Sequence, residues 1–513
     1  QNINVGVAIT AGKLGIGFTD ANVKVGNTAL DSLTTGGANT GVGHNVLTAN
    51  TEGDNNTGIG REALTSNTTG DENVAAGAFS LDANTTGNYN NSFGTQALGS
   101  NTTGSNNTAV GHYALNTNST ASNNVAIGYH ALRLNTTGAF NVAVGYQALD
   151  ANTTASSNSA FGSGALGANT TGTDNVAVGR YALGGNTTAN YNTAIGYAAM
   201  QANTTGEYNV AVGSQALDAN TTADSNVAVG HYSLTKNTTG GANIAIGRNA
   251  LQENTTTNDN VAVGLEALKN NTASANIAVG RGAFTANTTG SDGVAIGYLT
   301  LDANTTGTRN TAVGSQALGA NTEGDRNTAV GYYALKTNTT VDYLTAVGYG
   351  ALYGNTTGTQ NTGLGYAAVF TNTTGSNNTG VGYNALDHNT TGDANTAVGS
   401  ESLDANTTGT RNTAVGYQAL KASNGNDNTA VGRQTLLANT TGASNTALGK
   451  SAMTDSTTGD YNTAVGNNCL LANTTGNENT AVGAFALDAV TTAGNNTAIG
   501  YLALSASTTS GST

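Results

Sequence analysis

A seventeen-residue phrase repeats through almost the whole chain and constrains its fold more than any other feature. Residues 395–411 show it in typical form: Asn-Thr-Ala-Val-Gly-Ser-Glu-Ser-Leu-Asp-Ala-Asn-Thr-Thr-Gly-Thr-Arg. The glycine of Ala-Val-Gly, here called the anchor glycine, recurs 29 times from Gly26 to Gly500, and all but two of the intervals are 17 residues long. Such a strict period indicates a repeat protein in which each unit packs on its neighbours.

Each period is predicted to form one coil of a solenoid. The segment Asn-Thr/Val-Ala-Val/Ile-Gly is rich in β-branched residues and alternates around a small residue, which is typical of a short strand. The Val or Ile before the anchor is expected to face the interior. Leu, four residues after the anchor, is expected to form a second apolar ladder, and its segment (146–149, for example) is either a single helical turn or a second short strand. The sequence therefore predicts an all-β, parallel β-solenoid (a β-roll or β-helix) of about 29 coils of 17 residues.

The repeat also divides the chain. Residues 1–25 do not fit the period and are expected to form an N-terminal cap or junction, residues 26–504 form the array, and residues 505–513 form a tail. The two short intervals, Gly264–Gly280 and Gly416–Gly432, each lose a residue from the Asn-Thr-Thr-Gly segment. A segment that tolerates length changes is expected to be a solvent-facing loop. Its stacked asparagines are predicted to hydrogen-bond from coil to coil.

Composition argues against several classes of partner and chemistry. The net charge is −14 with no cluster of Lys and Arg, which does not favour nucleic acid, and no apolar run is long enough for membrane insertion. Catalysis needs unlike groups at one place, whereas this chain repeats like groups along a line. We therefore predict no catalytic residues, no metal site and no cofactor. The three histidines that directly follow an anchor, His44, His112 and His231, are 68 or more residues apart. The single cysteine, Cys469, stands in a slot usually held by Ala, which predicts a small buried side chain.

Two repeated positions are candidates for contacts with other molecules. The residue after the anchor is often Tyr or Arg, and such a row suits glycans or a protein partner, unless the rings only shield a corner of the coil. Its candidate members are Tyr129, Tyr146, Tyr197, Tyr332, Tyr349, Tyr366, Tyr383, Tyr417, Arg180 and Arg248. The central strand residue is predicted to form an outward ladder of Ala and Gly that packs against a second subunit, or that the coil's own loops cover. Its candidate members are Ala126, Ala143, Ala160, Ala177, Gly363 and Gly380.

The asparagine of Asn-Thr-Thr is a candidate for N-glycosylation, because the tripeptide is an acceptor sequon. Turn chemistry alone accounts for the same three residues. The candidates are Asn67, Asn84, Asn101, Asn135, Asn203, Asn304 and Asn406.

The repeat resembles those of a known group of fibres. The phrases Asn-Thr-Ala-Val-Gly-Tyr-Gln-Ala-Leu (412–420) and Asn-Asn-Val-Ala-Ile-Gly (123–128) resemble repeats of phage tail-fibre and related bacterial surface fibre proteins, as does Gly-Lys-Leu-Gly-Ile-Gly (12–17). The Val-Ala-Ile-Gly core is more distantly similar to the coils of trimeric autotransporter adhesin heads. The resemblance implies a left-handed roll packed as a homotrimer, an extracellular place on a virion or cell surface, and host or cell-surface glycans as ligands.

Two functions are therefore expected to compete. The first is an extracellular structural or adhesive fibre shaft without catalytic activity, and the alternative is an ice-binding or glycan-binding solenoid that uses Thr or Tyr ladders. Thr-Thr pairs such as Thr153-Thr154 argue weakly for ice, because neighbouring strand residues point to opposite faces and a flat array needs Thr-x-Thr. The slot three residues before the anchor is mostly Val or Ile from Val125 to Val294, and Thr in every coil from Thr311 to Thr497.

Overall fold

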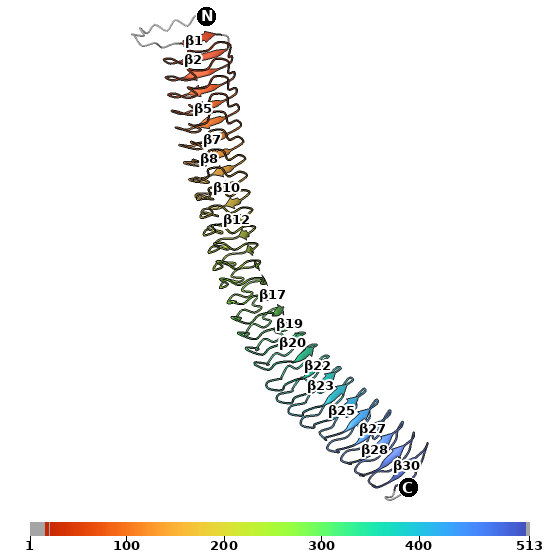
Figure 1. Cartoon of the computed structure of the whole chain (residues 1–513). Coiled ribbons are helices and arrows are strands. Elements are labelled where there is room, and N and C mark those ends of the chain that lie inside the picture. The colour runs from red at the N-terminus through yellow and green to blue at the C-terminus, as the bar shows by residue number, and fades with distance from the viewer. Residues whose placement is uncertain (1–15, 20, 509–513) are drawn as a thin grey trace, which may run out of the picture. The chain divides into compact units, whose positions relative to one another are not determined.

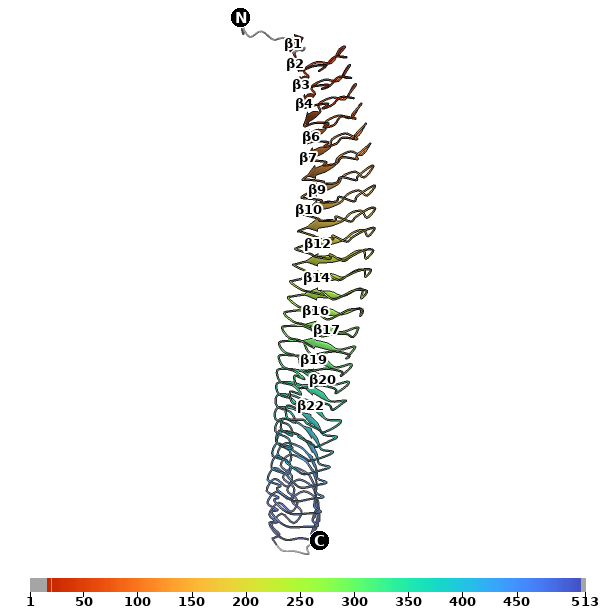
Figure 2. The same cartoon turned by 90° about the vertical axis from the view of Figure 1, so that its left-hand side faces the viewer.

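The computed structural model describes residues 16–19 and 21–508, and it divides into two compact units, Gln1–Asn258 and Asp259–Thr513. Both units are all-β parallel β-solenoids, and the chain makes about 28–29 coils roughly 17 residues apart. No helix occurs among the described residues. One short strand per coil lies beside the strand of the next coil, as Figures 1 and 2 show within each unit. The predicted fold class is confirmed.

The described residues of the first unit form fifteen strands. β1 (Ile16–Thr19) pairs antiparallel with β2 (Asn22–Val25), and from β2 onward the strands pair parallel and in sequence order. The others are β3 (Thr40–Val42), β4 (Thr57–Ile59), β5 (Val74–Ala76), β6 (Asn91–Phe93), β7 (Thr108–Val110), β8 (Val125–Ile127), β9 (Val142–Val144), β10 (Ser159–Phe161), β11 (Val176–Val178), β12 (Thr193–Ile195), β13 (Val210–Val212), β14 (Val227–Val229) and β15 (Ile244–Ile246). Most of the predicted cap, including residues 12–15 of the Gly-rich phrase, lies outside the described residues.

The second unit continues the same pattern with parallel pairs throughout. Its strands are β16 (Val261–Val263), β17 (Ile277–Val279), β18 (Val294–Ile296), β19 (Thr311–Val313), β20 (Thr328–Val330), β21 (Thr345–Val347), β22 (Thr362–Leu364), β23 (Thr379–Val381), β24 (Thr396–Val398), β25 (Thr413–Val415), β26 (Thr429–Val431), β27 (Thr446–Leu448), β28 (Thr463–Val465), β29 (Thr480–Val482) and β30 (Thr497–Ile499). Both 16-residue periods keep the strand register, pairing Val261 with Ile277 and Thr413 with Thr429. The deletion is therefore absorbed outside the strand, as the sequence predicts.

The strand faces are the reverse of those predicted. The central Ala or Gly of the strand is buried inside the coil, whereas the Val, Ile or Thr on either side points outward. The interior is too narrow for a larger central residue, because the Leu ladder and its neighbours fill the opposite wall. A Cβ on Gly380 would lie 2.6 Å from Val369 Cγ2, and one on Gly58 would lie 2.5 Å from Val46 Cγ1. Small central residues therefore serve close packing within one chain.

The segment that carries the Leu ladder is neither a helical turn nor a strand. It is a run of turns in which alternate residues take a left-handed backbone, as at Gln147 (φ 53°) and Leu149 (φ 51°). The Gln147 N–H donates to Tyr129 in the preceding coil and the Leu149 N–H to Ala165 in the next, each at 3.0 Å. Leu149 is completely buried, so the prediction of a core leucine ladder is confirmed.

Two ladders of buried asparagine side chains join the coils. In the first, the Asn135 amide of Asn-Thr-Thr donates to Asn118 Oδ1 and to the Gly138 carbonyl, both at 2.9 Å. The second ladder is formed by the asparagine that precedes each strand. The backbone N–H of Asn141 donates to Asn124 Oδ1, and its side-chain amide donates to the Ala155 carbonyl, both at 2.9 Å. The predicted coil-to-coil bonding is confirmed, but the asparagine is buried and does not face solvent.

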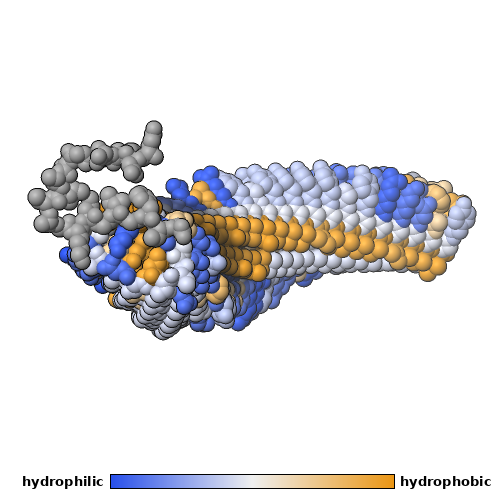
Figure 3. Space-filling model, turned by 90° about the horizontal axis from the view of Figure 1, so that it is seen from above, coloured by the Kyte–Doolittle hydropathy of each residue, from blue (hydrophilic) through white to orange (hydrophobic). Residues whose placement is uncertain are grey.

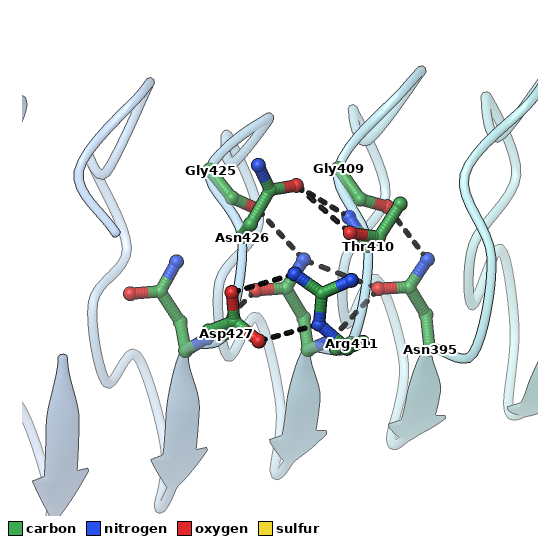
Figure 4. A network of polar contacts seen from close by, with 9 residues as sticks. Asn395, Gly409, Thr410, Arg411, Gly425, Asn426 and Asp427 are labelled. Atoms are coloured by element: carbon green, nitrogen blue, oxygen red, sulfur yellow. Dashed lines mark hydrogen bonds and ion pairs between the residues drawn. The ribbon is translucent and has the colours of Figure 1, made fainter. Parts of the chain in front are cut away.

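The same second ladder appears in the second unit in Figure 4, where Asn412 N–H donates to Asn395 Oδ1 at 3.0 Å. Beside it, the Arg411 guanidinium forms a two-bond ion pair with Asp427 in the next coil, at 2.6 Å and 2.9 Å. This pair is exposed, so it contributes little to stability. The buried amides, whose hydrogen bonds are shielded from water, hold the coils together.

Candidate binding surfaces

The proposed glycosylation sites are not accessible in the folded chain. The side-chain nitrogen that would carry a glycan is completely buried, and it donates both to the asparagine of the preceding coil and to the glycine carbonyl three residues on. This holds for Asn67, Asn84, Asn101, Asn135, Asn203, Asn304 and Asn406. A glycan would break both bonds, so the interpretation of these asparagines as decorated loop residues is wrong for the fold.

The predicted subunit-contact ladder is also wrong, because its members line the interior. Ala126, Ala143, Ala160 and Ala177 are completely buried, and Gly363 and Gly380 are buried as well. Period-two alternation fixes which residues share a face but not which face is inside. The surface that another molecule can reach is therefore formed by the residues that flank this ladder.

In the first unit this outward face is a double row of apolar side chains, here called the apolar face, over β8–β15. Typical members are Val176 and Val178, 37% and 36% exposed, and Ile244 and Ile246, 37% and 39% exposed. Only two outward positions of these eight strands, Ser159 and Thr193, are polar. Figure 3 shows that bands of hydrophobic residues also cross successive coils toward the C-terminal end of the array.

In the second unit the outward face changes chemistry along the array. β16–β18 present Val or Ile on both sides of the central Ala, whereas β19–β30 present Thr on one side and Val, Leu or Ile on the other. We call the latter the Thr-x-Val face. The change from Val to Thr in the sequence therefore alters an exposed surface and leaves the core unchanged. The Thr-Thr pairs lie elsewhere: the first hydroxyl, as in Thr153, donates to the Thr170 carbonyl one coil on at 3.1 Å.

The residues that follow the anchors form the exposed row that the sequence predicts. The eight candidate tyrosines, Tyr129, Tyr146, Tyr197, Tyr332, Tyr349, Tyr366, Tyr383 and Tyr417, are 42–53% exposed, and Arg180 and Arg248 are exposed too. Where tyrosines occupy consecutive coils their rings stack: the centroids of Tyr349 and Tyr366 are 4.9 Å apart and those of Tyr366 and Tyr383 are 5.3 Å apart. Binding of a partner by this row stays a prediction.

A second aromatic column lies beside this row in the second unit and was missed in the sequence. Tyr353 and Phe370, five residues after their anchors, stack at 5.0 Å, and Tyr333 meets the edge of Tyr353 at 5.9 Å. With Tyr349 and Gly350 they line a hollow of about 180 Å³. A hydrogen bond with Tyr333 raises the pKa of the neighbouring Tyr332 to about 12. The sequence signal is two consecutive aromatic residues in the position five after the anchor. The same position holds Lys336 in the coil before them and Asp387 in the coil after.

Two polar clusters also escaped the sequence analysis. His130 lies one coil beyond His112, so these two histidines are closer than the spacing of the post-anchor histidines suggested. The Tyr129 ring stacks on both, with its centroid 3.9 Å from that of His130 and 5.7 Å from that of His112. Burial lowers the pKa of His130. Among the described residues, no third side chain that could bind a metal lies close enough to complete a site with these two histidines.

The second cluster joins His388 with two carboxylates in the second unit. Nδ1 of His388 is 3.8 Å from Asp387 and 3.6 Å from Asp404, and burial raises the pKa of both carboxyl groups. The Lys421 ammonium lies 3.9 Å from Asp404, so it already supplies a positive charge to this group. These contacts describe an ordinary surface ion-pair cluster.

The single thiol is structural. Cys469 is buried, and its Sγ donates to the Ala481 carbonyl at 3.2 Å. Burial raises its pKa to about 11, so it is a poor nucleophile at neutral pH. The prediction of a small buried side chain is confirmed.

No protein-family model matches the chain, and no characterised protein shows significant sequence similarity to it. The part of the chain that the structure describes contains no helix that could span a membrane.

Proposed function

We propose that this chain is a self-associating structural fibre shaft that is displayed outside a cell or virion. The observation that supports it best is the apolar face of the first unit. Apolar strips that cross many coils are rare on monomers and mark surfaces that other molecules cover. The occupant that fits is a second copy of the chain, because its own rows of Val and Ile repeat at the same coil spacing.

The size of the apolar face is sufficient for a stable interface. A Val or Ile side chain offers on the order of 100–150 Å² of surface, and about a third of it is exposed at most outward positions of β8–β15. Fourteen such side chains on the eight strands give roughly 470–700 Å², which overlaps the lower end of the 600–1,000 Å² or so that each partner buries in a stable interface. A homotrimer, as the resemblance to fibre repeats implies, is the assembly proposed, and glycan adhesion is the accompanying role of the exposed tyrosines.

Replacing the apolar face with the residues of the Thr-x-Val face tests this proposal. The variant keeps a β-branched residue in every strand, and the same slot holds Thr in β19–β30. Its six changes to Thr are at Val125, Val142, Val176, Val210, Val227 and Ile244. We expect the wild type to form trimers at micromolar concentration and the variant to dissociate toward the 50.8 kDa monomer in mass photometry.

The matched control changes as many exposed residues away from this face, from Thr to Ser, at Thr137, Thr154, Thr171, Thr188, Thr205 and Thr222. Circular dichroism should show both variants folded, with association lost only in the first. A wild-type chain that stays monomeric at these concentrations contradicts the proposal, as does a variant that associates unchanged.

Ice binding is the second candidate function, because the Thr-x-Val face presents Thr in every coil of β19–β30. Its rows repeat at the strand spacing of about 4.8 Å and carry no charge along the strands. It is a regular single row of outward Thr with a row of apolar side chains beside it, two residues away in each strand.

Thermal hysteresis distinguishes this function from that of a plain shaft. If the Thr-x-Val face binds ice, the chain at micromolar concentration depresses the freezing point below the melting point. Replacing Thr379, Thr396 and Thr413 with Lys then abolishes the gap. Equal freezing and melting points for the wild type exclude ice binding.

A further inference from the structure

We propose that the hollow over Gly350 binds one pyranose ring of a neutral glycan, with Tyr349, Tyr353 and Phe370 contacting the ring and the phenolic hydroxyls at the rim hydrogen-bonding to it. This inference deepens the adhesive part of the proposed function by naming the ligand class and the place. It is carried by three features: the shape of the hollow, the chemistry of its lining, and its position where the repeat is broken.

The shape arises from two aromatic columns with a missing side chain between them. Tyr332, Tyr349 and Tyr366 form the outer column, with centroids 5.6 Å and 4.9 Å apart. Tyr353 and Phe370 form the inner column. Between them stands Gly350, in a slot that holds Gln in Gln316 and Gln418. The missing side chain leaves room for the Phe370 ring to lie against Gly350, and a hollow of about 180 Å³ remains among these rings.

The lining favours a neutral, hydroxylated ligand with one apolar face. It consists of aromatic rings and a glycine, and no charged side chain contributes to it. Lys336 holds the same position as Tyr353 in the preceding coil. Its ammonium lies away from the hollow, near Gly319 and the Asp302 carboxylate. A pyranose offers C–H groups to ring faces and hydroxyls to phenols, which matches aromatic side chains that carry a polar tip. Aromatic walls with a few polar groups are typical of small-ligand sites.

The location distinguishes this hollow from ordinary tyrosine stacking. The second slot also holds aromatic residues in other coils, as at Tyr113, Tyr181 and Tyr232, and glycine at Gly164 and Gly282. Only here does an aromatic residue occupy the fifth slot, at Tyr353 and Phe370, and these two rings join Tyr333 and Gly350 around the hollow. The coil interior beneath the hollow, as at Ala351 and Leu352, keeps the usual residues.

Restoring the phrase should remove the site and keep the fold. Gly350→Gln puts in the residue that the slot accepts at Gln316 and Gln418, with a nearly equal φ (61° against 56° and 55°). Its Cβ would lie 2.8 Å from Phe370 Cε2, so the ring is displaced and the hollow filled. Phe370→Asp likewise puts in the residue that Asp387 and Asp404 hold. The control is Tyr89→Ser, which removes an equally exposed tyrosine, 51% exposed, that lies in the first unit outside the post-anchor row and whose slot holds Ser at Ser157.

The measurement is saturation-transfer NMR and titration of the full chain with maltoheptaose, cellohexaose and chitohexaose, and with choline and a polyproline peptide. We expect at least one oligosaccharide to bind, Gly350→Gln and Phe370→Asp to weaken this binding tenfold or more, and Tyr89→Ser to leave it unchanged. No binding of any oligosaccharide, binding of choline or polyproline alone, or equal binding by all variants overturns the inference. Mass photometry of the same samples reports on self-association separately, so failure of the shaft proposal is recognised independently.

Discussion

Gly213→Ala is expected to destabilise the first unit by about 3–5 kcal/mol, among the largest effects of any single methyl group in this chain. Gly213 is an anchor glycine with φ 140°, a conformation that side chains rarely adopt. An added Cβ would lie 2.6 Å from the carbonyl oxygen and 2.7 Å from the carbonyl carbon of Gly230 in the next coil. Both atoms belong to the backbone, so the coils must separate to relieve the contact. Urea unfolding followed by circular dichroism measures the loss.

The control is Gly37→Ala, at a glycine that has no positive φ and whose added Cβ would meet only Asp54 Oδ1, at 3.8 Å. We expect a change within about 0.5 kcal/mol there. Equal unfolding midpoints for Gly213→Ala and the wild type would falsify the account of the anchor as a site of backbone contact between coils.

Asn203→Asp is expected to cost about 3–5 kcal/mol at neutral pH, because it places an unpaired charge in the buried amide ladder. The Asn203 amide donates to Asn186 Oδ1 at 2.9 Å and to the Gly206 carbonyl at 3.0 Å, and its Oδ1 accepts from Asn220 at 2.8 Å. A carboxylate has the same shape but turns two donated bonds into contacts between acceptors. The thermal midpoint, measured against pH, reports the effect.

The pH dependence follows from the sign of the expected shift. Burial and two facing acceptors raise the pKa of the new carboxyl group in the folded chain above its unfolded value of about 3.9. The unfolded chain therefore loses its proton first as pH rises, and the variant loses stability above about pH 4. Below that pH the protonated acid can donate one bond, and part of the stability returns.

Asn88→Asp is the matched control for this variant, since Asn88 Oδ1 accepts the Asp71 N–H at 2.7 Å and the Asp71 side chain plays the same part for Asp54. That slot accepts a carboxylate, so we expect little change. If both variants melt together, the buried ladder does not determine stability in the way described.

Much of the fold could be predicted from the sequence because the period repeats every constraint many times. The 17-residue spacing is visible from any two consecutive coils. The strand before the anchor and the core leucine are visible in each single coil. Which face of the strand is buried could not be predicted, because alternation around Ala126 is equally consistent with either face inside. Volume decides it: Val46 and Val369 fill the interior where Gly58 and Gly380 stand opposite them. Asn-Thr-Thr was misread as a glycan acceptor for a related reason, since a sequon does not reveal that its amide is already bonded twice.

The candidate sites show the same division. The exposed tyrosine row occupies one slot and could be predicted, whereas the hollow combines the first, second and fifth slots of different coils. No single period contains Tyr333, Gly350 and Phe370, and only the stacking of coils brings them together. The apolar face was likewise hidden, because Val and Ile in a strand are ordinarily taken as core residues.

The coil-to-coil bonding described above has a consequence for how such a chain can change over generations. Most of the bonds between coils join residues 14 to 18 positions apart, so the partners of a coil lie in its two neighbours. Excising residues 214–230 would bring Gly213 directly before His231 and rejoin each ladder with a residue of its own kind. Unequal recombination in steps of seventeen codons would therefore lengthen or shorten the array without creating a new interface between coils.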